Sequence, residues 1–233
     1  MRLYAPFSRL DPAVIAPILP IDSEYPFSQE IVLTRFLAAL ATTALLLFTA
    51  SAYAAPITTE EALKDRVLGD PNAPIEIIEY SSLTCSHCRQ FHVDILPELK
   101  KNYLDTGRAK LIYRDFPFDQ IGLMGTMLTR CAPPSRYFQF LDVLFQNQEK
   151  WSRDPNPLQA LTRIGKLGGL SEADFNACTE NKAIVDGVLQ TRLDAGNRFE
   201  VNSTPTFIIN GEKRIVGSQP YKVFDDLLKK LEK

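Results

Sequence analysis

The chain has few histidines and cysteines, and it has little excess of charge of either sign. It has two histidines and four cysteines, and its single C-x-x-C pair has no second pair and no H-x₃-H pattern to complete a tetrahedral zinc site. The formal net charge is −2, which gives no electrostatic footprint for nucleic acid or an anionic membrane surface. We therefore expect no metal, no cofactor and no nucleic acid, and we look for partners among small molecules and proteins.

Internal repeats and low-complexity tracts are also missing from the sequence. What the chain does have is apolar residues, which make up 45% of its 233 positions and are enough for a real core. This excludes a small scaffold that depends on disulfides. It predicts one domain, or one domain that carries a large insertion.

The longest apolar run lies near the N-terminus. Residues 36–55 are apolar or small throughout, follow Arg35, and end in the small-x-small pattern at 52–54 that signal peptidase needs. We predict a signal peptide that is cleaved after Ala54. An uncleaved membrane anchor is the alternative, because about 20 apolar residues can span a bilayer.

Residues 1–30 precede this run and follow neither a helical nor a strand period. With them the leader would exceed the roughly 15 to 30 residues of an ordinary signal peptide, so we expect translation to begin at Val32 or Leu33. The sequence thus predicts an exported, periplasmic protein. An even number of cysteines favours disulfides there, because the periplasm is oxidising.

Alternation and helical spacing predict a strand, a helix and a second strand after the leader. We expect a buried strand at 75–80, a helix from 86 to about 103 that Pro97 should kink, and a strand at 110–114. Together they form a βαβ unit, which should be right-handed.

Residues 119–199 then carry only helical signals. After them, Asn210 and Gly211 mark a β-hairpin, and residues 221–231 form an amphipathic closing helix. The order βαβ, helical block, ββα predicts an α/β domain interrupted by an all-helical insertion.

The two cysteines Cys85 and Cys88 fall where the first strand ends and the helix begins. Free N–H groups in a first helical turn and the positive end of the helix dipole favour negative charge, so the Cys85 thiolate should be stabilised. Cys88 lies one turn inward, close enough to form a disulfide yet expected to be buried. We predict that Cys85 meets the substrate, since thiolates are the nucleophiles in exchange, and that Cys88 resolves.

Both histidines lie close to this pair. His87 can donate a hydrogen bond or place positive charge near the Cys85 sulfur; alternatively it is an exposed histidine without a role. His92 follows Cys88 by four residues, but a zinc site built from these four side chains would need ligands on different faces of one helix. We expect His92 to be a satisfied helix histidine.

Three segments carry a family resemblance: LGDPNAPIEIIEYSSLTCSHCRQFH at 68–92, YRDFPFD at 113–119, and VNSTPTFIING at 201–211. Together they resemble the DsbA-like branch of the thioredoxin-fold oxidoreductases. A C-x-x-C pair alone would be weak evidence, whereas its combination with a preceding strand, a helical insertion and a Thr-Pro entering a hairpin is specific.

The resemblance implies a thioredoxin fold in two parts. The thioredoxin-like domain would comprise 67–118 and 200–233, and the helical insertion 119–199. Residues 55–66 would form a short N-terminal lead, and 1–54 an N-terminal extension plus the signal peptide.

The resemblance also implies an activity. The chain would be a monomeric thiol:disulfide oxidoreductase that donates its Cys85–Cys88 disulfide to unfolded or newly exported proteins and is reoxidised by a membrane quinone-linked partner. Ser86 stands where the best-known oxidases have proline, which leaves the potential open. A reductase or isomerase of the same fold and a metal-binding C-x-x-C module are the alternatives. The exported isomerases carry an N-terminal dimerisation domain, for which the short lead leaves no room.

Three further site residues follow from the resemblance. Thr204 and Pro205 match the loop that faces the dithiol, where the proline is cis and the backbone can pair with an extended substrate; an ordinary proline at a strand entry is the alternative. Glu79 matches a buried acid that exchanges a proton with Cys88. A second acid at Glu76 shows that strand alternation alone could explain it.

The remaining cysteines, Cys131 and Cys178, lie in the helical block. In an exported chain we expect them to form a structural disulfide, which would contribute about 4 kcal/mol at most. Two buried thiols or a second redox couple are the alternatives. Large apolar residues of the block are expected to be core and not a ligand site: Leu141, Leu144, Phe145 and Trp151.

Overall fold

The computed structural model describes residues 57–232. The predicted signal peptide, its cleavage after Ala54 and the predicted translation start lie outside these residues. Within 57–232, no helix is both long enough and apolar enough to cross a membrane.

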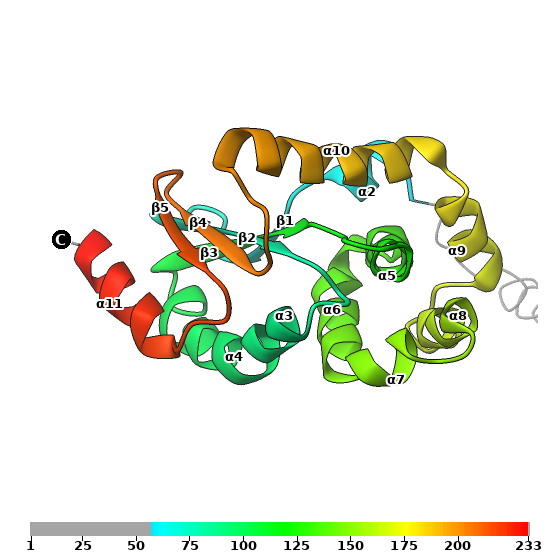
Figure 1. The fold of residues 1–233 in the computed structure, drawn as a ribbon, viewed down its shortest axis with the longest axis horizontal. Coiled ribbons are helices and arrows are strands. Elements are labelled where there is room, and N and C mark those ends of the chain that lie inside the picture. Colours follow the sequence, from blue (N-terminus) through cyan, green and yellow to red (C-terminus); the bar gives the residue numbers. More distant parts are fainter. Residues whose placement is uncertain (1–56, 233) are drawn as a thin grey trace, which may run out of the picture. The chain divides into compact units, whose positions relative to one another are not determined.

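A five-stranded mixed sheet forms the centre of the fold, with the strand order β1-β3-β2-β4-β5 (Figure 1). Strands β2 and β3 are parallel, and the other neighbouring pairs are antiparallel. Central strand β2 is buried on both faces apart from half-buried Glu76, as expected for a strand with neighbours on both sides. The strands are β1 (Arg66–Gly69), β2 (Ile75–Ser81), β3 (Ala109–Asp115), β4 (Thr206–Ile209) and β5 (Lys213–Val216).

The predicted strands at 75–80 and 110–114 and the hairpin around Asn210 are confirmed. Edge strand β1 was not predicted, because its four residues are too few to show alternation. Its last residue, Gly69, has a φ of 98°, a value that favours glycine.

The helix after β2 is continuous but not uniform. It consists of α3 (Ser86–Gln90), a π-helical turn η1 (Phe91–Ile95), α4 (Leu96–Leu99) and a second π-helical turn η2 (Lys100–Leu104). Pro97 is the second residue after η1, whose last bond runs from the Leu96 N–H to the Phe91 carbonyl. The expected disturbance at Pro97 therefore takes the form of a local change of helical register.

Between β3 and β4 the described chain contains only helices, and one more follows β5. Asp119, Asn156, Ser171 and Asn181 cap four of them, each accepting a backbone N–H with its side chain. A short helix, α2 (Thr59–Leu63), precedes β1. The others are α5 (Gln120–Cys131), the 3₁₀ turn η3 (Pro134–Arg136), α6 (Tyr137–Gln146), α7 (Gln148–Ser152), α8 (Pro157–Leu167), α9 (Glu172–Thr179), α10 (Lys182–Phe199) and α11 (Tyr221–Leu231).

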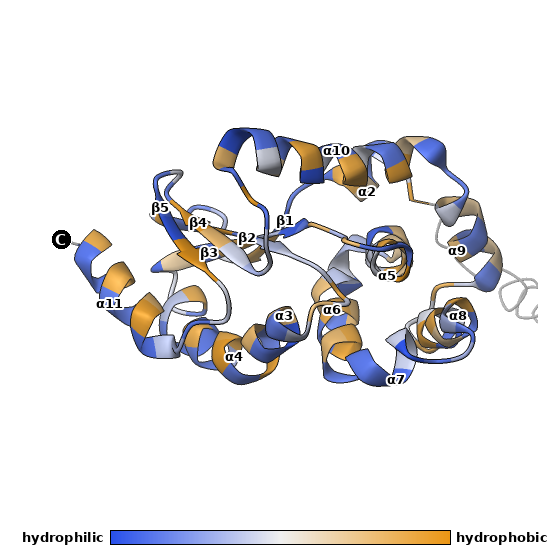
Figure 2. Cartoon of the chain, viewed as in Figure 1, coloured by the Kyte–Doolittle hydropathy of each residue, from blue (hydrophilic) through white to orange (hydrophobic). Residues whose placement is uncertain are grey.

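Apolar side chains cover both faces of the sheet. One buried cluster joins the helical block to the dithiol helix and contains the predicted core residues Leu141, Leu144, Phe145 and Trp151. On the same face, Phe91, Phe207 and Phe224 pack together. On the opposite face, Ile78, Tyr80 and Ile112 form a separate cluster with Ala195 of α10. Helices α10 and α11 alternate polar and apolar residues along their length, as surface helices do (Figure 2).

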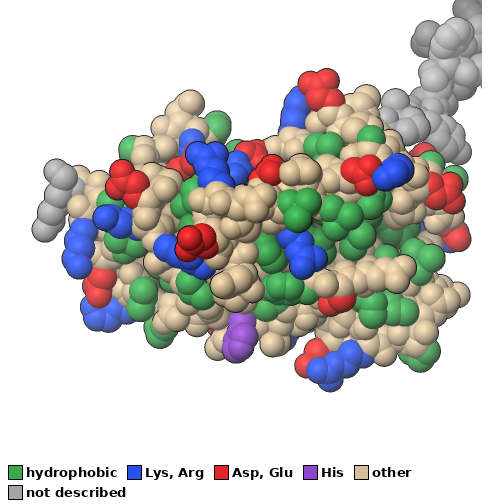
Figure 3. All heavy atoms as spheres, turned by 45° about the horizontal axis from the view of Figure 1, so that its top comes forward, with side chains coloured by type: hydrophobic (Ala, Val, Ile, Leu, Met, Phe, Trp, Pro, Cys, Tyr) green, Lys and Arg blue, Asp and Glu red, His purple; other side chains and the backbone are tan. Residues whose placement is uncertain are grey.

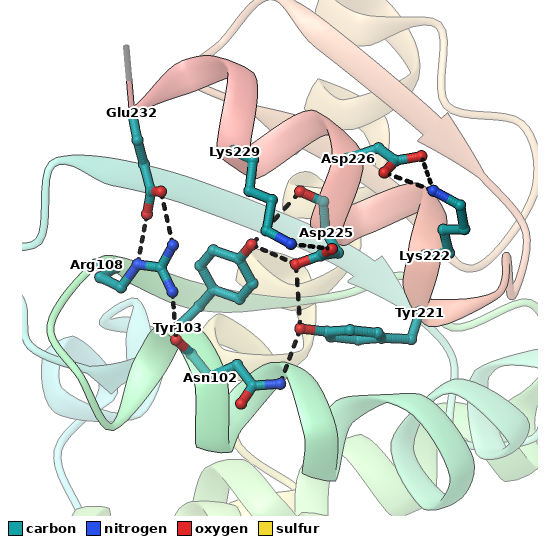
Figure 4. A network of polar contacts seen from close by, with 9 residues as sticks. All are labelled: Asn102, Tyr103, Arg108, Tyr221, Lys222, Asp225, Asp226, Lys229 and Glu232. Carbon is teal, nitrogen blue, oxygen red and sulfur yellow. Dashed lines mark hydrogen bonds and ion pairs between the residues drawn. The ribbon is translucent and has the colours of Figure 1, made fainter.

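Polar contacts hold α11 against the η2 turn (Figure 4). The Tyr103 hydroxyl donates to Asp225 at 2.7 Å, and the Asn102 amide donates to the Tyr221 hydroxyl at 2.9 Å. Arg108 forms a two-pronged ion pair with Glu232. The C-terminal helix is thereby attached to the far end of the helix that begins at the dithiol.

Candidate active site: a dithiol at the start of a helix

Cys85 occupies the N-cap position of α3. Its sulfur accepts a hydrogen bond from the Cys88 backbone N–H at 3.3 Å, and its own N–H donates to the Ser82 carbonyl at 3.1 Å. The cap places the sulfur at the positive end of the helix, where unpaired N–H groups favour an anion. Cys85 remains partly exposed, so a substrate can reach it.

Cys88 is fully buried one turn further along, and both thiols are free in this structure. The pKa of Cys85 falls to about 6, chiefly because the Cys88 thiol donates to the Cys85 sulfur, with further help from Thr204 and backbone N–H groups. Burial and the neighbouring Cys85 sulfur raise the pKa of Cys88 well above its ordinary value. The two sulfurs therefore differ strongly in charge and access.

The Thr204–Pro205 peptide bond is cis and lies beside the dithiol. The Thr204 carbonyl accepts from the Cys85 thiol at 3.4 Å. Strand β4, which follows this bond, runs antiparallel to β2, and Thr206 pairs with Tyr80. This pairing brings the loop before β4 to the loop after β2, although the two are far apart in sequence.

His87 is exposed on the first turn of α3. Its backbone N–H contributes to the low pKa of Cys85. Within the described residues, its imidazole makes no hydrogen bond to another protein group. In this structure the backbone N–H of His87, and not its imidazole, stabilises the Cys85 thiolate.

Glu79 of β2 and His92 of η1 form a buried pair. The imidazole Nε2 lies 3.0 Å and 3.1 Å from the two carboxylate oxygens, and the ring stacks on Phe145 at a centroid distance of 4.1 Å. The prediction of a satisfied helix histidine is wrong in one respect, because Nδ1 is buried and has no partner among the described residues. The sequence pattern of the helix could not predict that His92 contacts Glu79, because Glu79 lies on strand β2.

Comparison with known proteins places this site in a family. A family model described as thioredoxin matches residues 61–230. The crystal structure of Wolbachia pipientis alpha-DsbA1 is similar with a TM-score of 0.67 and 35% identity, covering 72% of this chain and 90% of that one. The chain is a DsbA-like member of the thioredoxin family. The thioredoxin fold expected from the sequence is thereby confirmed.

Other relatives of this DsbA-like chain agree. A protein of Rickettsia felis named as a protein-disulfide oxidoreductase is 33% identical over 148 residues, 63% of this chain and 53% of that protein. Disulfide bond formation protein D of Bacillus subtilis is 23% identical over 154 residues, 62% of this chain and 67% of that protein. The chain spans about half the length of the Rickettsia relative.

Gln148 is a site residue of this DsbA-like chain that the sequence analysis missed. From α7 its buried amide Nε2 donates to the Leu83 carbonyl at 2.8 Å and to the Cys85 carbonyl at 2.9 Å. It ties the helical block to the loop that carries the nucleophile. No local signal could have revealed it, because a single glutamine in a helical segment cannot be told from an ordinary surface residue by sequence alone.

The other two cysteines lie apart from the dithiol of this DsbA-like chain. Cys131 at the end of α5 and Cys178 in α9 form a disulfide with a Cα–Cα distance of 5.9 Å. It fixes two helices of the block to each other. Among residues 57–232, no group of three or more His, Cys, Asp or Glu side chains is arranged to hold a metal ion.

Proposed function

We propose that the chain is a thiol:disulfide oxidoreductase that donates its Cys85–Cys88 disulfide to other proteins. The asymmetry of the two sulfurs supports this most directly. With a pKa of about 6, Cys85 in the reduced form is about 90% thiolate at pH 7. Buried Cys88, whose pKa is raised, stays protonated.

Exchange proceeds in two displacements at sulfur. A substrate thiolate attacks the Cys85 sulfur, the Cys85–Cys88 bond breaks, and a mixed disulfide with Cys85 forms. A second substrate thiolate then attacks the substrate sulfur of that mixed disulfide and releases Cys85 as a thiolate. The substrate loses two electrons and gains a disulfide, while the dithiol takes up the two electrons.

The low pKa of Cys85 favours this direction. A thiol of low pKa is the better leaving group, and stabilising the thiolate stabilises the reduced form. The gap between the pKa of about 8.5 for a free thiol and about 6 for Cys85 corresponds to about 3 kcal/mol. Partial exposure of the sulfur reduces this to about 2 kcal/mol, or about 40 mV in favour of the reduced state.

The proposal extends to substrate and setting. The backbone around Thr204 and Pro205 would pair with an extended segment of an unfolded or newly exported protein, independently of its side chains. We place the activity in the periplasm, as a monomer with a quinone-linked membrane partner that reoxidises the dithiol. The apolar run at residues 36–55, with its cleavage pattern ending at Ala54, supports export.

The decisive measurement is the equilibrium of the Cys85–Cys88 couple with a glutathione buffer. We expect a potential above the roughly −270 mV of a thioredoxin, in the direction of the roughly −120 mV of a strong disulfide donor. A value at the thioredoxin end would make the chain a reductase. Refolding of a protein with scrambled disulfides, assayed in parallel, separates an isomerase from both.

A further inference from the structure

Burying the Glu79–His92 pair costs free energy. Glu79 is 0% exposed and the His92 side chain is 2% exposed. Taking two ionisable groups out of water costs several kcal/mol for each ion, and well-packed apolar residues often serve stability better. Stability alone is therefore a poor reason for the pair, whereas a buried ionisable pair beside a reactive thiol suggests a role in chemistry.

Three titratable groups from three different elements lie near this pair. The ring of Tyr113 from β3 contacts the imidazole edge to face at a centroid distance of 5.7 Å. Cys88 lies one helical turn before His92, and the charge of His92 acts on Asp142 of α6. Cys88 and Tyr113 belong to one buried cluster, and the charges of both Glu79 and Cys88 act on the Tyr113 hydroxyl and raise its pKa. The acid and the buried thiol therefore lie around the same tyrosine.

Asp142 differs from the other two because it is exposed at the surface. A positive charge on His92 lowers the pKa of Asp142, whereas partial burial raises it. The imidazole therefore lies within electrostatic reach of an acid that is in contact with solvent. The π-helical turn η1, which carries His92, stands between the dithiol and the rest of the helix, and such turns are frequent at functional sites.

The pair also has room for one more proton. Nε2 is engaged with both oxygens of Glu79, whereas Nδ1 is buried and has no partner within residues 57–232. The imidazole can therefore exist with one proton or with two, without breaking its bond to the carboxylate.

We propose that His92 is a positioning residue of the redox site, which holds the Glu79 carboxylate and shares with it the proton that Cys88 gains and loses. The proposal rests on the proposed function and deepens it. When a substrate thiolate breaks the Cys85–Cys88 bond, Cys88 leaves as a thiolate and the pair supplies its proton. When the dithiol is reoxidised, Cys88 returns the proton, attacks the Cys85 sulfur of a mixed disulfide, and expels the other thiolate.

The proposal needs His92 because a lone buried carboxylate would be a poor proton acceptor in each redox cycle of the dithiol. Without a partner, an acid in an apolar pocket is held in its neutral form and cannot take a proton. The imidazole Nε2, which lies within hydrogen-bond distance of both oxygens, orients the carboxylate. In this way His92 acts on Cys88 through Glu79.

The test uses the reduced full chain and a chromogenic aromatic disulfide, 5,5′-dithiobis(2-nitrobenzoate), in a stopped-flow instrument. The first coloured thiolate is released when Cys85 attacks the reagent, and the second when Cys88 resolves the mixed disulfide. The first phase depends on Cys85 alone, so it is an internal control. His92→Gln keeps an N–H that can donate to Glu79 but cannot take up a proton, and His92→Leu removes both functions.

We expect both variants to slow the second phase by about 100-fold, the usual size of a proton-transfer contribution, and to flatten its pH profile while the first phase stays unchanged. Tyr113→Phe is the matched control, because it removes a hydroxyl from the same pocket without losing a hydrogen bond; its second phase should stay as in the wild type. Urea midpoints of all three variants test whether each is folded.

A second phase in His92→Gln that equals the wild type in rate and pH profile would overturn the proposal, because hydrogen bonding alone would then suffice. Equal slowing of both phases would overturn it as well. An ordinary pKa for Cys85, seen in the first phase, would instead count against the disulfide-donor function and would leave the comparison of second phases intact.

Discussion

The two cysteine pairs of this chain have opposite surroundings. Cys85 and Cys88 are three residues apart at a helix start, and one of the two sulfurs is accessible. Cys131 and Cys178 are separated by 47 positions, both are buried, and they join two helices. The first pair is free in this structure and the second is bonded.

This difference shows that position in the fold, more than cysteine content, decides what a pair of sulfurs does. A helix N-terminus stabilises one sulfur as a thiolate and leaves the bond between the two easy to open. Two packed helices give neither sulfur such help, and a bond between them closes a long loop that would otherwise be free in the unfolded chain.

Removing one sulfur of the active pair is the strongest way to test this contrast. We expect Cys85→Ser to abolish oxidation of a reduced model protein, because no nucleophile or leaving group remains at the helix start. The double variant Cys131→Ala/Cys178→Ala should retain nearly all of that activity. A large loss of activity in the double variant would mean that the second pair takes part in exchange.

The same double variant should be the most damaging to stability. Without the crosslink, the unfolded chain gains entropy, and we expect the free energy of unfolding to fall by about 2 to 4 kcal/mol in a urea titration. The comparison protein is the wild type with its Cys85–Cys88 pair reduced. An unchanged urea midpoint would show that the long-range bond does not stabilise the block.

Acidification should lower the stability of the reduced protein more than that of the oxidised protein. The pKa of Cys85 in the folded reduced form, about 6, lies below that of a free thiol, about 8.5. The stability that this thiolate contributes is therefore present above pH 8.5 and is lost as the pH falls through 6. We expect a loss of about 2 kcal/mol from the reduced form between pH 8.5 and pH 5, after allowing for exposure.

The oxidised form has no thiol at this site and should not show that loss. Urea midpoints of the two forms across the pH range measure the difference, and thiolate absorbance near 240 nm locates the titration of Cys85. If the gap in stability between the two forms is the same at both ends of the range, the thiolate is not stabilised.

The smallest effect is expected at His87. Its imidazole is exposed and its backbone N–H, which survives substitution, is the group that acts on Cys85. A charge near a helix end is worth about 0.3 to 1 kcal/mol, so His87→Ala should make the couple less oxidising by about 10 to 20 mV. Titration against glutathione measures this; a much larger change would assign a direct role to the side chain.

How much could be predicted from the sequence depended on the range of each interaction. Strands β2 and β3, the hairpin and α11 each carry their own period, so they were found. Strand β1 is too short to show one. The Glu79–His92 pair and the Gln148 bridge were missed because each joins residues on different elements, and neither side alone marks the contact.

The surface agrees with the composition. Figure 3 shows basic and acidic side chains interspersed around a group of hydrophobic ones, without a large area of one sign. Exposed large apolar residues include Phe118, Leu167 and Leu193. The face drawn in Figure 3 therefore has little charge preference.

The surroundings of Cys85 combine segments that are synthesised at different times. Its partner β4 is the fourth strand in chain order, and the loop ahead of β4 completes the surroundings of Cys85. A ribosome delivers Cys85, Cys88 and Cys131 before Cys178 exists. During that interval Cys131 can be crosslinked to Cys85 or Cys88 but not to Cys178, its partner in the folded chain. The order of synthesis therefore allows wrong disulfides in this chain, and thiol-disulfide exchange is the reaction that corrects them.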